Sequence, residues 1–356
     1  MINVTKTFLP PQEEYNAILK RAWDTGWMTN RGVLVQELEE KLKDYLGVPN
    51  MIATTNGTLP LQIAIKALGL KGEIITTPFS YVATTSSIVW EGCTPVFVDI
   101  HPEYLTIDET KIEAAITKKT SAILATHVFG NPCAVEEIEI IAKKYNLKVI
   151  YDAAHCFGVT YKGQSIFNYG DISTCSFHAT KLFHTGEGGA LFCKDKELQN
   201  KLFSHHNFGH KTSESFQGIG VNAKMSELQA AMGLAVLPNI KGIFNLRKKI
   251  VELYNDNLNF TELSKLKLRA NIYWNYSYYP VLFNNETDLI NALINLNREN
   301  IHPRRYFYPS LNKLDYVRNV DCIISEDVAS RILCLPLSHD LSSVEVKIIY
   351  EILNSL

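Results

Sequence analysis

The stretch that decides the fold is Ile172-Ser-Thr-Cys-Ser-Phe-His-Ala-Thr-Lys181-Leu-Phe-His-Thr-Gly-Glu-Gly-Gly189-Ala-Leu-Phe-Cys193. Two short β-prone runs, 172–176 and 189–193, flank a loop that carries Lys181 and ends in a glycine-rich turn. Such runs are typical of strands that are buried on both faces of a sheet, because they do not alternate strictly between apolar and polar residues. The segment therefore predicts a strand–loop–strand unit with a lysine at the mouth of the loop.

The same kind of run recurs from about residue 50 to residue 195. Further β-rich runs lie at 51–54, 73–77, 95–99, 121–126 and 148–152. Helical patterns separate several of them, at 59–70, 81–90, 108–116 and 134–145. Alternation of buried strands with helices implies a mostly parallel sheet that is covered by helices on both faces. We therefore predict an α/β fold.

The flanking regions have a different character. Amphipathic helical patterns precede the alternating region at 11–25 and 34–46, and long helical patterns follow it at 224–237 and 240–258. The run 273–279 is aromatic and alternating, which is typical of a strand, and helical patterns then cover 288–299, 325–332 and 344–356. We predict a large α/β domain, 1–244, with N-terminal helices, and a smaller α+β domain, 245–356.

Composition excludes several classes of protein. The 356 residues are 46% hydrophobic and 20% charged, which is ordinary for a globular chain with a sizeable core. The 35 Lys and Arg residues against 37 Asp and Glu give a net charge of −2, so no basic field is offered to nucleic acid or anionic lipid. No apolar run is long enough to cross a membrane, and the N-terminus does not resemble a signal peptide. The seven scattered cysteines lack a Cys-x-x-Cys pair, which favours reduced thiols and a cytoplasmic location.

Lys181 has a natural chemical partner upstream. The apolar run 147–151 ends in Asp152, a carboxylate at the end of a predicted strand. Pyridoxal 5′-phosphate chemistry needs this pair, because a lysine amine forms a Schiff base with the cofactor aldehyde and a carboxylate keeps the pyridine nitrogen protonated. We therefore predict that Lys181 and Asp152 are catalytic residues, with a solvated loop lysine as the alternative.

A phosphate site is predicted at residues 54–58, where a predicted strand ends and a predicted helix begins. Gly57 would let the backbone approach a ligand closely, and the first amides of the helix could bind phosphate. The alternative is an ordinary helix cap, because Asn56 and Thr58 are good capping residues. Ser176, at the end of a strand before Lys181, offers a hydroxyl to the same phosphate.

Two rings are candidates for contact with the cofactor. Phe79, after the strand 73–77, could lie against a flat heterocycle, with a core or hinge aromatic as the alternative. His155, three residues after Asp152, could contact the ring hydroxyl. No metal is predicted, because His178 and His184 lack the His-Glu-x-x-His spacing of a zinc site. A Rossmann oxidoreductase is a poor second choice, because the sequence has no Gly-x-Gly-x-x-Gly loop after its first strand and no Tyr-x-x-x-Lys pair.

Taken together, these motifs resemble the DegT/DnrJ/EryC1/StrS family, the pyridoxal-phosphate aminotransferases of nucleotide-sugar biosynthesis. The matched segments run over nearly the whole chain, at 27–32, 55–58, 77–84, 94–99, 127–132, 152–155, 176–189, 220–230 and 332–337. The resemblance implies the aspartate-aminotransferase fold (PLP fold type I), with a large seven-stranded sheet domain and a small C-terminal domain. It also implies a homodimer with shared active sites.

The resemblance also assigns roles to residues. Lys181 is similar to the Schiff-base lysine, Asp152 to the pyridine-nitrogen partner and Phe79 to the stacking aromatic, while Gly57, Thr58 and Ser176 match the phosphate cup. Asn222 resembles the residue that reaches the phosphate of the neighbouring subunit.

Two positions depart from the common family pattern. Lys224 stands where many relatives have arginine, at a position implicated in binding the donor carboxylate, and it lacks the bidentate geometry of arginine. His155 replaces a commoner glutamine. Because Lys181 is retained, transamination is favoured over the C-3 dehydration of a branch that has histidine there.

The implied reaction is a ping-pong transamination with L-glutamate as amino donor and a nucleotide-linked keto sugar as acceptor. The motifs resemble most closely the members that convert dTDP-4-keto-6-deoxy-D-glucose to dTDP-4-amino-4,6-dideoxy-D-glucose, an O-antigen sugar precursor. Arg304 and Arg305 are candidate pyrophosphate contacts, with ordinary surface arginines as the alternative. Two other functions stay open: C-3 amination of a dTDP-3-keto sugar, and a catalytically idle regulatory or binding protein.

Overall fold

A seven-stranded sheet forms the centre of the computed structural model, which describes residues 1–356. Its order is β2-β10-β9-β6-β5-β3-β4, and all strands are parallel except β10, which runs antiparallel to both its neighbours. The strands are β2 (Met51–Thr54), β3 (Glu73–Thr76), β4 (Thr94–Phe97), β5 (Thr120–Thr126), β6 (Lys148–Asp152), β9 (Ile172–Ser176) and β10 (Gly189–Phe192). The seven strands predicted between residues 50 and 195 and the α/β fold are therefore confirmed.

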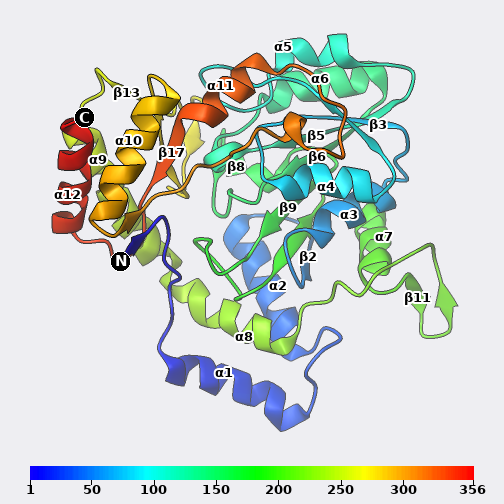
Figure 1. Ribbon diagram of the computed structural model, residues 1–356. Coiled ribbons are helices and arrows are strands. Elements are labelled where there is room, and N and C mark those ends of the chain that lie inside the picture. Colours follow the sequence, from blue (N-terminus) through cyan, green and yellow to red (C-terminus); the bar gives the residue numbers. More distant parts are fainter.

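Helices cover both faces of this sheet (Figure 1). Successive residues of a strand point to opposite faces, so Ile150 joins one core while Val149 and Tyr151 join the other. The first face packs on α3 (Leu59–Ala67), α4 (Val82–Trp90) and α7 (Lys196–His206), and the second on α2 (Val33–Leu46), α6 (Val135–Tyr145) and α8 (Glu227–Val236). Helix α1 (Gln12–Thr25) packs against α8 on the outside of the second layer (Figure 1).

Three local predictions need correction. Helix α7 was not predicted, because its sequence is mostly polar; Asp195 caps its first turn by accepting from the Leu198 amide. The expected helix 108–116 divides into the short helix α5 (Glu109–Ile112) and a 3₁₀ turn at 113–115. The expected helix 224–237 begins only at Glu227, where Ser226 and Gln229 form a capping box.

The C-terminal part forms a second unit around a three-stranded antiparallel sheet. Its strands are β13 (Leu263–Lys265), β15 (Tyr279–Phe283) and β17 (Ile332–Leu335), and its helices are α10 (Glu286–Arg298), α11 (Ile323–Arg331) and α12 (Ser343–Asn354). The long helix α9 (Ile240–Asn257) enters both cores: Phe244 packs with the large sheet and Ile250 with the small one. The packing thus changes close to residue 245, and the domain division at that point stays a prediction.

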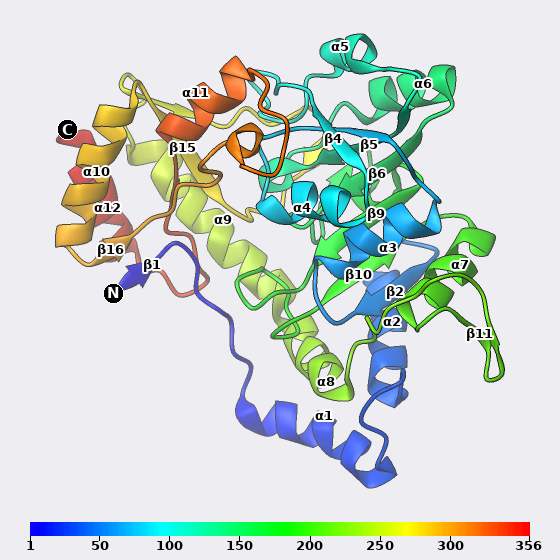
Figure 2. The same ribbon diagram turned by 45° about the vertical axis from the view of Figure 1, so that its right-hand side comes forward.

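The N-terminus lies against this second unit rather than the first (Figure 1). Strand β1 (Ile2–Asn3) pairs in parallel with β16 (Ile301–His302). On the other side of the molecule, the hairpin β11 (His210–Thr212) and β12 (Ser215–Phe216) projects away from the body in both views (Figure 2).

The predicted strand at 273–279 is wrong. Strand β14 (Ile272–Tyr273) ends at the first of these residues and β15 begins at the last. In between, the Asn275 side chain donates to the carbonyls of His155 and Phe157, and Tyr276 adopts a left-handed φ of 55°. The alternating aromatic segment is therefore a connection between the two units, and hydrogen bonds hold it in place. Strand β14 pairs with β7 (Thr160–Tyr161), which pairs with β8 (Gln164–Ser165).

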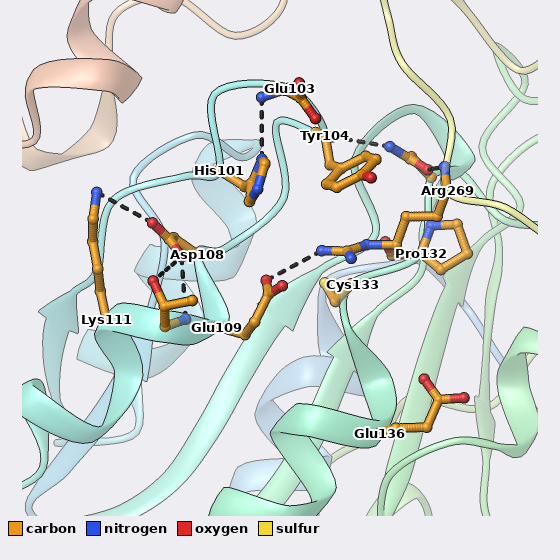
Figure 3. A network of polar contacts seen from close by, with 12 residues as sticks. His101, Glu103, Tyr104, Asp108, Glu109, Lys111, Pro132, Cys133, Glu136 and Arg269 are labelled. Carbon is orange, nitrogen blue, oxygen red and sulfur yellow. Dashed lines mark hydrogen bonds and ion pairs between the residues drawn. The ribbon is translucent and has the colours of Figure 1, made fainter.

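A polar network joins the segment after β13 to the large unit (Figure 3). Arg269 donates to the Pro132 carbonyl at 2.9 Å and pairs with Glu109 at 3.1 Å, and its guanidinium lies 4.3 Å from the centre of the Tyr104 ring. The buried Asn131 accepts from the Arg269 backbone amide. These contacts fix the position of the C-terminal unit relative to the sheet. None of the helices combines the length and the apolar character that crossing a bilayer requires.

Candidate active site

Most of the predicted site residues meet at the carboxyl edge of the large sheet. Strands β2, β6 and β9 end there at Thr54, Asp152 and Ser176, and Gly189 lies in register with both Thr54 and Ser176. Ligands of open α/β sheets bind outside this edge. A cavity of about 310 Å³ opens at this place. Its lining includes Gly57, Thr58, Tyr81, Asp152, His155, Ser176, Lys181, Tyr278, Arg304 and Tyr306.

Lys181 is the amine of this cavity. Its Nζ donates to the Tyr278 hydroxyl at 3.3 Å and lies 5.5 Å from the centre of the Tyr278 ring. Burial lowers the pKa of Lys181 below its ordinary value, although Tyr306 and Asp152 act in the opposite direction. A lowered pKa increases the fraction of uncharged amine, which is the form that can attack a carbonyl carbon or accept a proton.

Asp152 supplies a buried carboxyl group on the same side. Its Oδ2 accepts from the Thr84 hydroxyl at 2.7 Å and its Oδ1 from the Ala154 amide at 3.1 Å. Burial raises the pKa of Asp152, while these two hydrogen bonds and the charge of Lys181 act to lower it. A buried carboxyl group of this kind favours a cationic partner, because burying a lone negative charge is costly.

His155 is a neutral hydrogen-bond donor to the cavity. Its Nδ1 accepts from the Phe129 amide at 3.1 Å, which assigns the ring proton to Nε2. Burial lowers the pKa of His155 well below its ordinary value, and the charge of Lys181 acts in the same direction. The ring lies nearly parallel to the Phe129 and Phe307 rings, whose centres are 6.1 and 5.7 Å away.

The loop after β2 lies directly against the end of β9. A side chain at position 57 would place its Cβ 2.8 Å from the Cβ of Ser176, so only glycine permits this approach. Asn56 accepts from the amides of Thr58 and Leu59, each at 2.9 Å. Asn56 is thus a helix cap, whereas the Thr58 side chain makes no capping bond. The structure brings Gly57, Thr58 and Ser176 together at the N-terminus of α3, where anions bind readily.

Phe79 does not line the cavity. It is fully buried and packs against Phe129 and Phe307, with ring centres 6.2 and 5.6 Å away. Tyr81, two residues later, is 54% exposed and lies on the cavity wall. A stacking ring must face the cofactor, so Tyr81 replaces Phe79 as the candidate for that contact.

Of the two predicted arginines, likewise, only one lines the cavity. Arg304 lines the cavity, with its guanidinium 4.8 Å from the centre of the Tyr306 ring. Arg305 pairs instead with Glu286 at 2.6 Å and donates to the Ser330 carbonyl at 2.8 Å. Arg305 therefore has a structural partner in the C-terminal unit, and only Arg304 faces the site.

Asn222 and Lys224 also lie outside this cavity. Lys224 donates to Asn222 at 2.6 Å, lies 4.4 Å from the centre of the Phe208 ring and lines a separate cavity of about 1080 Å³ beside the β11–β12 hairpin. Neither residue reaches the Lys181 cavity of its own chain.

Three tyrosines of the lining were missed from the sequence: Tyr81, Tyr278 and Tyr306. Tyr81 could have been chosen from its place in the same short motif as Phe79. Tyr278 and Tyr306 come from the C-terminal unit, and no local pattern shows that this unit folds back over the sheet edge.

Comparisons with known proteins agree with this geometry. The model of the DegT/DnrJ/EryC1/StrS aminotransferase family matches residues 11–354. A Shigella dysenteriae protein named dTDP-4-amino-4,6-dideoxy-D-glucose transaminase is 43% identical over 96% of this chain and 95% of its own length.

Solved structures give the same result. DesI in the presence of its TDP-sugar product has a TM-score of 0.95 at 31% identity, covering 99% of this chain and 92% of DesI. NtdA from Bacillus subtilis with bound cofactor PMP has a TM-score of 0.89 at 28% identity, covering 96% of this chain and 81% of NtdA. The chain belongs to the DegT/DnrJ/EryC1/StrS aminotransferase family.

Proposed function

We propose that this aminotransferase uses pyridoxal 5′-phosphate to transfer the amino group of L-glutamate to C-4 of dTDP-4-keto-6-deoxy-D-glucose, giving dTDP-4-amino-4,6-dideoxy-D-glucose. The observation that carries the proposal is the meeting of a buried carboxyl group, an amine of lowered pKa and a glycine-lined helix N-terminus in one cavity. The name of the 43% identical relative supports the choice of sugar.

The residues present fit the cofactor. Lys181 would hold its aldehyde carbon and Asp152 its ring nitrogen, because a buried carboxyl group needs a cationic partner. His155 Nε2 would donate to the ring hydroxyl, and Tyr81 would cover the ring face. The close approach of Gly57 to Ser176 leaves room for a phosphate at the N-terminus of α3.

Bound pyridoxal phosphate supplies an electron-accepting ring that stabilises negative charge at the reacting carbon. The chain supplies the proton transfers. The uncharged Lys181 amine would take the proton from Cα of glutamate, and its ammonium form would release that proton to the cofactor. In the second half of the reaction the amine would take a proton back from the cofactor, and its ammonium form would deliver it to C-4 of the sugar. In both halves of the reaction, Asp152 would stabilise a positive charge on the nitrogen of the cofactor ring. His155 stays neutral because of its burial, so it orients the ring without adding a charge.

Arg304 is the candidate contact for the sugar nucleotide. It is exposed at the cavity wall, and its guanidinium has no carboxylate partner. Arginine binds phosphate oxygens through two parallel hydrogen bonds. We therefore retain Arg304 as a pyrophosphate contact and remove Arg305 from the proposed site.

A homodimer would complete the site. Asn222 and Lys224 do not reach the Lys181 cavity of their own chain, yet they lie beside a projecting hairpin with exposed apolar side chains. Phe216 and Ile219 are 67% and 72% exposed there, which is typical of an interface. In a two-fold dimer, Asn222 would reach the cofactor phosphate of the partner, and Lys224 would contact the carboxylate of the amino donor. The cytoplasmic location and the link to O-antigen synthesis stay predictions.

Two measurements test the proposal. Borohydride treatment of the holoprotein should attach a pyridoxyl group to the peptide that contains Lys181, as read by mass spectrometry. Incubation with L-glutamate and a panel of dTDP-keto sugars should then give a 4-amino product by NMR. A pyridoxyl group on another lysine would overturn the site, and a 3-amino product would replace the proposed sugar by the C-3 alternative.

A further inference from the structure

Tyr278 is in direct contact with the amine of Lys181. The sequence motifs do not explain this contact, and the proposed phosphate and ring contacts do not give Tyr278 a role. Its side chain is 3% exposed, and its hydroxyl is the hydrogen-bond partner of Lys181 Nζ at 3.3 Å. Its ring centre lies 4.8 Å from that of His155 and 5.3 Å from that of Tyr306. The ring is therefore packed beside two other cavity side chains, while its hydroxyl contacts the amine.

The backbone before Tyr278 is held by three buried side chains, those of Arg247, Asn275 and Ser277. Arg247, on α9, donates to the carbonyls of Tyr276 and Ser277 at 2.8 and 2.6 Å. Ser277 donates to the Phe129 carbonyl at 3.1 Å, and Asn275 donates to two carbonyls of the loop after Asp152. Arg247 is 3% exposed and Asn275 fully buried. Such an arrangement fixes residue 278 relative to the sheet edge.

The same segment contains backbone strain. Tyr276 has a φ of 55°, which is uncommon and unfavourable for a bulky residue. The turn lets Tyr278 face the Lys181 cavity while Tyr279 enters the core of the C-terminal unit, where it stacks on Tyr254. Strain of this kind persists only where the surroundings over-determine it, and here it aims one hydroxyl at the amine.

We propose that Tyr278 is the hydrogen-bond partner that holds the released Lys181 amine over the reacting carbon in both of its protonation states. A phenol can serve both states, because its O–H donates to the lone pair of the neutral amine and its oxygen accepts from the ammonium ion. Burial raises the pKa of Tyr278, so the phenol keeps its proton and adds no negative charge. A carboxylate in this place would instead favour the charged amine and weaken it as a base.

The inference rests on the proposed function, because it concerns the amine as a general base. Both halves of a transamination use the same base, whereas a residue that only places one substrate acts in one half. Tyr278→Phe retains the ring and loses the hydroxyl. We expect both half-reactions to slow by a similar factor, roughly 10- to 100-fold for a lost hydrogen bond to a charged group, with little change in either KM.

Tyr279→Phe is the matched control. It removes the neighbouring buried hydroxyl, which donates to Asn255 at 2.9 Å in the other core. This variant should keep both half-reaction rates, which stopped-flow absorbance of the holoprotein measures separately. Slowing of only one half-reaction by Tyr278→Phe, or equal slowing by Tyr279→Phe, would overturn the role of Tyr278.

A second readout does not depend on turnover. Acetic anhydride labelling of Lys181 in the cofactor-free full chain, followed by peptide mass spectrometry across pH, gives the pKa of the amine. The titratable groups that face Lys181 are Asp152, His155, Cys175, Tyr81 and Tyr306, and all of them stay in the variant. Loss of the phenol removes a partner from both forms of the amine, but the bond from the ammonium ion is the stronger one because it is charge-assisted. The labelling pKa should therefore fall in Tyr278→Phe and stay constant in Tyr279→Phe.

The outcomes separate this inference from the proposed function. If the wild-type protein transfers no amino group, the proposed function is wrong. The labelling curves of the wild type and Tyr278→Phe would then decide whether Tyr278 holds the amine. An active wild type with superimposable labelling curves for Tyr278→Phe would remove the inference and leave the proposed function intact.

Discussion

The floor and the rim of the Lys181 cavity are built in different ways. The floor, Asp152, His155 and Lys181, comes from the ends of adjacent strands and the loops that follow, and the acceptor atoms of Asp152 and His155 are fixed by backbone amides. The rim, Tyr81 and Arg304, is exposed and comes from two different units. We therefore expect variants of the floor to affect all substrates alike, whereas on the rim Arg304 should act on the sugar nucleotide and Tyr81 on the cofactor ring.

The largest expected effect is that of Lys181→Ala. Loss of the amine removes both the covalent link and the general base, so turnover should fall by about 10⁴-fold or more with every donor and acceptor. Cofactor should still bind through Asp152 and the phosphate contacts, as measured by equilibrium dialysis. An active Lys181→Ala protein would show that the base lies elsewhere on the floor.

Asp152→Asn should have the next largest effect. An amide cannot stabilise a positive ring nitrogen, so kcat should fall by roughly 10²- to 10³-fold for all substrates. Burial raises the pKa of Asp152, and the protonated acid cannot pair with a cation. Wild-type cofactor affinity should therefore decrease as the pH falls, while that of Asp152→Asn should vary less. Parallel pH profiles for the two proteins would contradict the assigned pairing.

The floor was more predictable from the sequence than the rim, for a physical reason. Asp152 and Ser176 end apolar runs, and parallel strands place their carboxyl ends at one sheet edge. Local pattern and chemistry therefore lead to these residues, and likewise to Gly57 and Lys181. His155 follows Asp152 so closely that the same argument reaches it.

The rim depends on contacts that no local pattern encodes. Arg304 and Arg305 are neighbours of identical type, yet Glu286 binds only Arg305. Phe79 and Tyr81 both follow β3, and the packing of Phe129 and Phe307 decides which ring is buried. These outcomes require the C-terminal unit to be in place, so the sequence alone led to segments that line the cavity but could not tell which of their side chains face it.

The two arginines provide a direct test of the rim. Arg304→Ala should raise KM for the sugar nucleotide roughly tenfold, because a charged hydrogen bond to phosphate is lost, and should leave the glutamate half-reaction unchanged. Arg305→Ala is the control: it should keep KM but lower the free energy of unfolding by about 1 kcal/mol, because its bonds to Glu286 and Ser330 are structural. Steady-state kinetics with urea melts would distinguish the two. Equal KM values would remove Arg304 from the substrate site.

The smallest expected effect concerns the layer beneath the floor, where His127 is fully buried and stacked on Tyr151 at 4.4 Å. Its Nδ1 accepts from the Cys133 amide at 2.9 Å, and burial lowers its pKa to about 3. Below pH ~6.5 the unfolded chain binds a proton on this side chain that the folded chain does not, so stability falls by about 1.4 kcal/mol per pH unit.

The loss should amount to roughly 2 kcal/mol between pH 6.5 and pH 5. His127→Gln should show a correspondingly smaller decrease over the same range in urea unfolding. His206, whose pKa burial lowers to about 4, titrates in the same direction in both proteins, so only the difference between their slopes reports on His127. Equal slopes would mean that acid reaches this layer without unfolding the chain. The cavity floor would then be accessible to solvent from the His127 side. Burial could no longer explain the pKa shifts of the floor residues.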